Sequence, residues 1–169
     1  MYSLNSYAKK KKMFYQENNK TLYRGVKLPY SSLLLYERAK GKIVLFSSFT
    51  SASESIFCAK RFCGRENSKE LYEANCLFSV ILLINNKWEN KWISNGINIQ
   101  KESKYKKEKE ILFQPFSFYL LKDVNINLEN YTADIYLDTI GKTEILEEKL
   151  KDNIDIEYNY SKNIIEIKE

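Results

Sequence analysis

The stretch Tyr105-Lys-Lys-Glu-Lys-Glu-Ile-Leu-Phe-Gln-Pro-Phe116 joins a charged segment to a short apolar one. We expect residues 109–113 to be extended. Side chains alternate across a strand, so Glu108 and Glu110 would then point to the same face. Two neighbouring carboxylates repel each other, yet such a pair can serve catalysis in two roles. One carboxylate stabilises a developing cation and the other accepts a proton. The alternative is a solvated surface of mixed lysine and glutamate.

Length and composition indicate a single globular domain over residues 1–169. Hydrophobic residues make up 44% of the chain, and five Gly and two Pro are too few for long flexible linkers. Within this domain we predict a helical segment over residues 1–19, a core over 20–150 and a strand or hairpin over 151–169.

The spacing of apolar residues predicts an α+β chain without internal repeats. Helices are expected over residues 3–18, 31–39, 54–63 and 143–151. Strands are expected over residues 21–26, 43–46, 76–84, 97–99, 110–113, 116–124 and 131–137, with a hairpin over 154–167. Ser31 stands where a helix N-cap is expected. Pro115 suggests a bend or bulge between two paired strands.

The charge pattern gives weak support for a polyanion partner. The net charge is +5, and the one dense basic run is Lys9 to Lys12. This run fits a solvated helix face, or a weak attraction to nucleic acid or anionic lipid. The aromatic residues interleaved with arginines that are typical of nucleic-acid readers are missing. We therefore expect no nucleic-acid partner, although an electrostatic nucleic-acid binder remains one hypothesis.

The chain contains no histidine. This excludes Ser-His-Asp and Cys-His catalysis, an HExxH zinc site and a histidine proton shuttle, and we expect no metal. Cys58, Cys63 and Cys76 lack CxxC spacing, which predicts buried or free thiols in a reducing compartment rather than a disulfide framework. No apolar stretch has transmembrane length, and no signal peptide is visible. We expect a cytoplasmic protein or a delivered effector rather than a disulfide-dependent extracellular one.

Three segments occur in a distinctive order. They are Leu22-Tyr-Arg24-Gly-Val26, Phe49-Thr-Ser51-Ala-Ser53 and Glu108-Lys-Glu110-Ile-Leu112. An arginine on a strand, a Ser-x-Ser strand end and a Glu-x-Glu strand resemble the R-S-E class of mono-ADP-ribosyltransferases, which includes vertebrate ecto-enzymes and bacterial binary toxins. The resemblance spans about residues 20–150. Ala52 departs from the pattern, because threonine often stands between the two serines.

The resemblance implies a fold and an activity. The fold would be an ADP-ribosyltransferase-like split β-sandwich of two small, mainly antiparallel sheets with flanking helices and NAD in the central cleft. The activity would be transfer of ADP-ribose from NAD, used as a co-substrate, to an arginine of a target protein, with release of nicotinamide. We expect a monomer that needs no metal and spans no membrane.

The family pattern also implies roles for the donor site. Glu110 would stabilise the oxocarbenium-like sugar that forms when the N-glycosidic bond breaks. Ser51 would hydrogen-bond Glu110 and fix its rotamer. Arg24 offers a planar fork of donors matched to the NAD phosphates. Gly25 would lie against the nicotinamide carboxamide, and Ser53 would make a further NAD contact.

The remaining implied roles concern the nicotinamide ring and the acceptor. Phe62 would stack on the ring. Glu108 would hold the acceptor guanidinium and help remove its proton, since a guanidinium is almost never neutral. Tyr105 would contact the target protein.

Simpler explanations exist for individual residues. Arg24 could be an ordinary edge-strand charge, and Ser51 and Ser53 could form only a turn and a helix N-cap. Phe62 could pack in the core. Trp88 and Trp92 could line a groove, or be partly buried. Two further functions also remain open: an NAD glycohydrolase that uses the same site, and a binding module that has lost catalysis.

Overall fold

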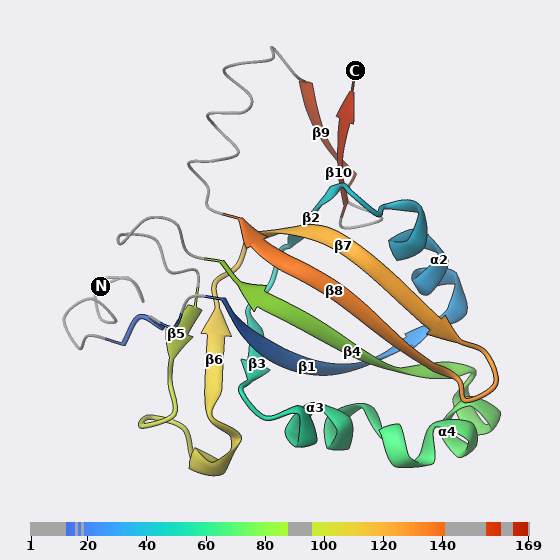
Figure 1. Cartoon of the computed structure of the whole chain (residues 1–169), viewed down its shortest axis with the longest axis horizontal. Coiled ribbons are helices and arrows are strands. Elements are labelled where there is room, and N and C mark those ends of the chain that lie inside the picture. Colours follow the sequence, from blue (N-terminus) through green and yellow to red (C-terminus); the bar gives the residue numbers. More distant parts are fainter. Residues whose placement is uncertain are drawn as a thin grey trace.

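The computed structural model of the protein describes residues 13–15, 17, 19–87, 96–140, 155–159 and 164–168. Figure 1 shows a twisted sheet flanked by helices. The strands are β1 (Lys20–Pro29), β2 (Ile43–Phe46), β3 (Thr50–Ser53), β4 (Leu77–Asn86), β5 (Gly96–Asn98), β6 (Glu110–Phe113), β7 (Ser117–Asn127), β8 (Thr132–Ile140), β9 (Asp155–Asn159) and β10 (Ile164–Lys168). The helices are α2 (Tyr30–Arg38), α3 (Ile56–Cys63) and α4 (Ser68–Asn75), with short 3-10 helices η1 (Arg65–Asn67) and η2 (Lys106–Glu108).

The strands follow one hydrogen-bonded order, β5-β6-β3-β1-β4-β8-β7-β2-β10-β9. Among the neighbouring pairs of this order, β4 and β8 run parallel and the others run antiparallel. The group β5-β6-β3 joins the other strands at a single residue pair, Tyr23 with Ser53. The two predicted sheets are therefore linked into one strand order by this one pair. The predicted α+β class, with mainly antiparallel strands and flanking helices, is confirmed.

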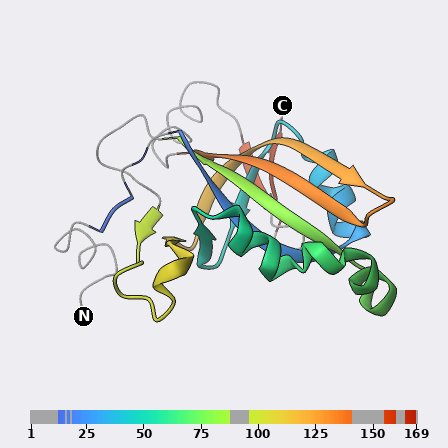
Figure 2. The same ribbon diagram turned by 60° about the horizontal axis from the view of Figure 1, so that its bottom comes forward.

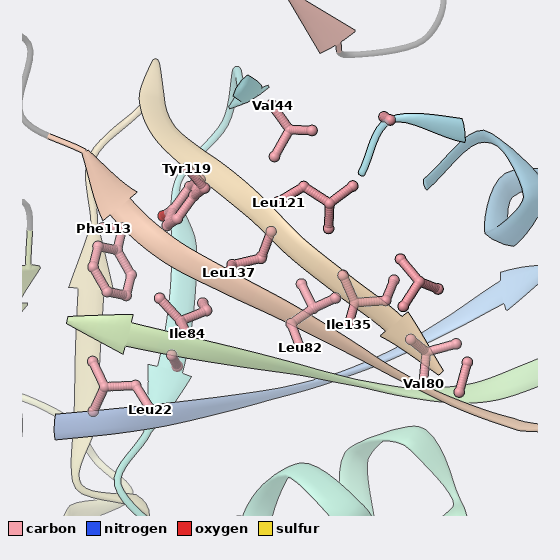
Figure 3. Packing of buried hydrophobic residues seen from close by; sticks show 14 of the residues in the cluster. Leu22, Val44, Val80, Leu82, Ile84, Phe113, Tyr119, Leu121, Ile135 and Leu137 are labelled. Atoms are coloured by element: carbon pink, nitrogen blue, oxygen red, sulfur yellow. The ribbon is translucent and has the colours of Figure 1, made fainter. Parts of the chain in front are cut away.

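The main core lies on the inner face of this curved sheet (Figure 3). On β4, Val80, Leu82 and Ile84 belong to this core, while Ile81 packs with Ala59 of α3 on the opposite face. This division follows from the alternation of side chains along a strand. Each such side chain contributes about 1.5–3 kcal/mol when fully buried.

Helices α2 and α3 cover opposite faces of the sheet. Leu33 of α2 is fully buried in the main core, whereas Cys63 of α3 packs on the outer face. Figure 2 shows α3 in front of β1 and α2 behind the long strands. Helix α3 therefore runs beside the junction between β1 and β3.

Most expected elements are present, with shifted bounds. The strands predicted over 43–46 and 110–113 have those limits, and β9 and β10 form the predicted C-terminal hairpin. Helix α4 was not predicted, because its sequence, SKELYEAN, is short and polar. The predicted helix 143–151 lies outside the described residues, and the single-domain boundary 1–169 stays a prediction.

Three local predictions are wrong. Phe14 forms a β-bridge with Ile97 rather than part of a helix, although residues 3–12 of that predicted helix lie outside the described residues. The N-cap of α2 is Pro29, not Ser31. Strands β6 and β7 flank Pro115 but have different partners in the sheet order, so they are not a bulged pair.

Candidate functional site

A cavity of about 380 Å³ lies where β1 and β3 diverge. It is lined by Tyr23, Arg24, Gly25, Ser51, Ala52, Ser53, Ala59, Phe62, Tyr105, Glu108 and Glu110. The eight residues singled out from the sequence all line it: Arg24, Gly25, Ser51, Ser53, Phe62, Tyr105, Glu108 and Glu110. The structure thus gathers four distant segments of the chain around one cavity, while their chemical roles stay predictions.

Arg24 spans the gap between the two strands. Its Nη1 donates a hydrogen bond to the main-chain oxygen of Ser51 at 2.8 Å and a longer one, 3.5 Å, to Ser51 Oγ. Strands β1 and β3 pair only at Tyr23, so beyond that point the arginine replaces the missing strand contact. β1 lies between β3 and β4, and the interpretation of Arg24 as an edge-strand charge is therefore wrong.

The guanidinium of Arg24 lies in a partly desolvated environment. Burial lowers its pKa from the ordinary arginine value, and the nearby Tyr119, Glu110 and Tyr36 act in the opposite direction. Arginine starts from so high a pKa that it stays charged at neutral pH. The cavity therefore contains a fixed, partly buried cation with donors suited to an anionic group.

The predicted hydrogen bond between Ser51 and Glu110 is not formed. Ser51 is opposite Leu112 in the β3–β6 register, whereas Ser53 is opposite Glu110. The hydrogen bond described for Ser51 Oγ comes from Arg24. Strand alternation still places Ser51 and Glu110 on the same face of the sheet. They are diagonal neighbours on adjacent strands, because Glu110 lies two residues before Leu112, the residue opposite Ser51.

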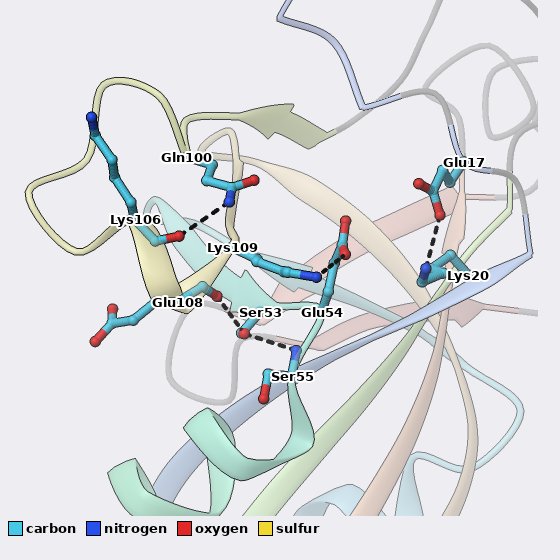
Figure 4. Close-up of polar contacts among 9 residues, drawn as sticks. All are labelled: Glu17, Lys20, Ser53, Glu54, Ser55, Gln100, Lys106, Glu108 and Lys109. Atoms are coloured by element: carbon cyan, nitrogen blue, oxygen red, sulfur yellow. Dashed lines mark hydrogen bonds and ion pairs between the residues drawn. The ribbon is translucent and has the colours of Figure 1, made fainter.

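Ser53 connects the strand end to the loop before β6. Its Oγ donates to the main-chain oxygen of Glu108 at 2.5 Å and accepts from the main-chain N–H of Ser55 at 2.9 Å (Figure 4). The residue is 7% exposed. The predicted N-cap role is wrong, because Ser55 is the N-cap residue of α3. The hydroxyl of Ser53 thus holds the main chain at Glu108 in place. Its predicted contact with NAD stays a prediction.

Glu108 reaches the cavity by a route that strand alternation did not predict. It is the last residue of η2, Lys109 follows in the left-handed region with φ 47°, and β6 begins only at Glu110. The prediction that residue 109 is extended is therefore wrong, yet both carboxylates line the same cavity. A left-handed residue reverses the chain direction locally, and here it turns Glu108 back toward α3.

Side chains from two other segments, one around Gln100 and one at Ser53 and Glu54, hold this turn in place. Gln100 Nε2 donates to the main-chain oxygen of Lys106 at 3.1 Å, and Lys109 Nζ lies 3.9 Å from Glu54 Oε2 (Figure 4). Together with the Ser53 hydrogen bond, these contacts fix both ends of η2. The carboxylate of Glu108 lies 3.4 Å from Nη2 of Arg61, a contact that no sequence pattern predicted.

Two aromatic side chains form the exposed rim of the cavity. Phe62 is 58% exposed and Tyr105 is 67% exposed. The alternative that Phe62 packs in the core is wrong, because Ala59 and Cys63 are the buried residues of α3. An exposed aromatic ring beside a polar cavity can stack on a planar ligand. Tyr23 also lines the cavity and was missed, since nothing but its place beside Arg24 marks it.

Gly25 is explained by helix packing. A Cβ at this position would lie 2.0 Å from the main-chain oxygen of Ala59 and 2.9 Å from the nitrogen of Cys63. The missing side chain thus lets α3 pack closely on β1. The predicted contact between the Gly25 main chain and nicotinamide is a separate matter and stays a prediction.

Other predicted features can be compared only for the described residues. Cys58, Cys63 and Cys76 are free, as predicted. Within the described ranges, no helix combines the length and apolar character needed to cross a bilayer, and no group of three or more potential ligands is placed to hold a metal. Trp88 and Trp92 lie outside the described residues.

The protein has the fold of solved ADP-ribosyltransferases. The Vis toxin, an ADP-ribosyltransferase from Vibrio splendidus, aligns with a TM-score of 0.62 and 21% identity over 98% of this chain and 63% of the Vis chain. The complex of Vis with agmatine aligns with a TM-score of 0.60 and 22% identity, over 96% of this chain and 66% of the Vis chain. The ADP-ribosyltransferase HopU1 of Pseudomonas syringae aligns with a TM-score of 0.51 and 17% identity, over 72% of this chain and 45% of the HopU1 chain.

These similarities are structural. The chain spans about three fifths of the Vis chain. No family model and no curated protein matches this sequence.

Proposed function

We propose that this protein is a mono-ADP-ribosyltransferase that transfers ADP-ribose from NAD to the guanidinium of a protein arginine and releases nicotinamide. The observation that supports this most is the convergence of Arg24, Glu108 and Glu110 on one cavity in a chain with this fold. A cation for phosphate and two carboxylates for a sugar cation and an acceptor are the groups that this reaction needs.

The cavity suits the nicotinamide end of a dinucleotide. Its volume, about 380 Å³, falls in the range of ligand pockets, roughly 300–1,000 Å³. The fixed cation of Arg24 would bind the diphosphate, and the exposed ring of Phe62 would stack on nicotinamide. The alternating strands place Glu110 on the cavity face of β6, where it would lie beside the ribose.

Bond cleavage would rely on Glu110. The bond between C1 of the ribose and the pyridinium nitrogen breaks, and its electron pair leaves with nicotinamide, which becomes neutral. The sugar then carries oxocarbenium character, as in glycoside hydrolysis. An ionised carboxylate held beside it stabilises that charge, and the loss of one such preorganised group typically costs about 10²–10³ in rate.

Transfer to the acceptor would rely on Glu108. An Nη atom of the acceptor guanidinium forms the new bond to C1, and one proton leaves that nitrogen. Glu108 would orient the guanidinium and accept the proton, then release it to water. The 3.4 Å contact between Glu108 and Arg61 supports this assignment, because it places a guanidinium beside this carboxylate. Vis binds agmatine, which is decarboxylated arginine and carries the same guanidinium.

The experiment is incubation with labelled NAD, first with agmatine and then with a panel of acceptor proteins. We expect nicotinamide release, labelled agmatine and, by mass-spectrometric mapping, label on arginine side chains. The Glu110→Gln protein is the control for non-enzymatic reaction. Nicotinamide release that agmatine leaves unchanged, with no labelled acceptor, would favour a glycohydrolase; label on another side chain type would refute arginine as the acceptor.

A further inference from the structure

The outer edge of α3 places an arginine of this chain beside the proposed acceptor carboxylate. Arg61 Nη2 lies 3.4 Å from Glu108 Oε1. The Arg61 side chain is 71% exposed, whereas that of Glu108 is 19% exposed. An exposed guanidinium therefore lies against a mostly buried carboxylate that lines the cavity.

The other three arginines of the chain are placed differently. Arg24 is bonded to Ser51 inside the cavity. Arg65 donates to the main-chain oxygen of Ser79 and forms an ion pair with Asp134. Arg38 is exposed at the end of α2 and does not line the cavity. Only Arg61 thus combines an exposed guanidinium with contact to Glu108.

We infer that Arg61 is a self-modification site, to which the enzyme attaches ADP-ribose within one molecule when no target protein is bound. This inference rests on the proposed function, because it gives Glu108 the role of holding an acceptor guanidinium. The balance is that of the proposed reaction: nicotinamide leaves with the electron pair of the old bond, an Nη of Arg61 bonds to C1 of the ribose, and the proton passes to Glu108.

The surroundings of Arg61 favour movement into the cavity. Its neighbour Phe62 lines the cavity, and α3 ends at Cys63, followed by the C-cap residue Gly64 with φ 68°. The ion pair with Glu108 is long and one partner is exposed, so it is weak and releases the guanidinium readily. A tethered acceptor reaches an effective concentration on the order of millimolar, which lets it compete with a dilute external acceptor.

The test uses the full chain with labelled NAD and no added acceptor. We expect the mass of one ADP-ribose on Arg61 after proteolytic mapping, formed at a first-order rate that does not change with protein concentration. Arg61→Lys keeps a cation at this position but should lose the label. Arg38→Lys is the matched control and should be labelled on Arg61 like the wild type. Inactive Glu110→Gln mixed with wild type should stay unlabelled.

Parallel reactions with agmatine distinguish a failure of self-modification from a failure of the proposed function. Labelled agmatine together with an unmodified Arg61 would overturn the self-modification and leave the proposed function standing. Label on Arg38, or on the inactive chain in the mixture, would equally overturn it. Absence of label from agmatine, from Arg61 and from acceptor proteins would count against the proposed function itself.

Discussion

The long strands and the short strands of this protein do different work. β1, β4, β7 and β8 are 9 to 11 residues long and bury apolar side chains on their inner faces. β3, β5 and β6 have only three or four residues each, and β3 and β6 carry the polar groups that face the cavity. The long strands supply most of the apolar core, while the short strands and their turn supply both carboxylates and both serines of a site that Arg24 of β1 and Phe62 of α3 complete.

The two groups are also held by different forces. Hydrophobic burial fixes the long strands without requiring particular residues at each position. The short strands depend on single polar contacts, such as those from Arg24 to the Ser51 oxygen and from Ser53 to the Glu108 oxygen. Such a hydrogen bond contributes about 0.5–1.5 kcal/mol, or about 1.5–3 kcal/mol when one partner is charged. Substitutions can therefore separate activity from stability.

The largest expected effect is on activity alone. Glu110→Gln should lower nicotinamide release and ADP-ribose transfer by about 10²–10³, because the amide cannot stabilise a sugar cation by charge. The thermal unfolding midpoint should stay unchanged. Glu129→Gln, on the exposed turn between β7 and β8, is the control and should retain full activity. Full activity of Glu110→Gln would refute the mechanism.

Gly25→Ala should impair both groups of strands. The new methyl group overlaps the main-chain oxygen of Ala59, so α3 must move away from β1. We expect a loss of about 1–3 kcal/mol in the free energy of unfolding, together with weaker NAD binding as Phe62 shifts. At Gly41 a methyl group meets nothing within 4 Å, so Gly41→Ala should cost only left-handed strain and keep NAD binding. Equal NAD binding by both variants would contradict this account of α3.

Ser53→Ala should act within the short strands. It removes the hydroxyl that bonds the Glu108 oxygen and the Ser55 N–H. We expect a loss of about 1 kcal/mol in stability, and a larger drop in agmatine modification than in nicotinamide release, because the turn carrying Glu108 loosens. Ser55→Ala is the matched control, since the Ser55 side chain makes no capping hydrogen bond. An unchanged ratio of the two products in Ser53→Ala would argue against this positioning role.

The smallest expected effect concerns the contact between the two groups. Tyr119 of β7 packs on Phe113 of β6, with ring centroids 5.8 Å apart, and burial raises the pKa of its phenol. Only the neutral phenol suits this site, so its stabilisation is complete below the unfolded pKa of about 10 and is lost as the pH rises above that value. Tyr119→Phe should reduce the alkaline loss of stability in urea titrations. Burial also raises the pKa of Tyr36, so part of the loss should remain.

The sequence predicted the scaffold through its apolar patterns. The run that became β4 and the four-residue segments that became β2 and β6 have sharp apolar limits. Helix α4 was missed because its few apolar residues give no clear period. The gathering of site residues was predicted from the family resemblance that three short motifs carry, since periodicity alone does not bring distant strands together.

The details of the site depend on contacts that sequence patterns do not encode. The left-handed conformation of Lys109 is unusual for a residue with a side chain, and it is stabilised by contacts from distant segments, Ser53 and Gln100. The contact between Arg61 and Glu108 joins residues 47 positions apart. The close approach of α3 to Gly25 was not predicted, because the sequence does not show which helix packs on β1 at this position.

The most direct test of the central claim is the yield of ADP-ribosyl-agmatine and of nicotinamide, measured in the same reaction for three proteins. We predict that the wild type produces both, that Glu108→Gln still releases nicotinamide but labels little agmatine, and that Glu110→Gln does neither. If Glu108→Gln gave the wild-type ratio of the two products, or if Glu110→Gln kept both, the cavity between β1 and β3 would not be the site of this reaction.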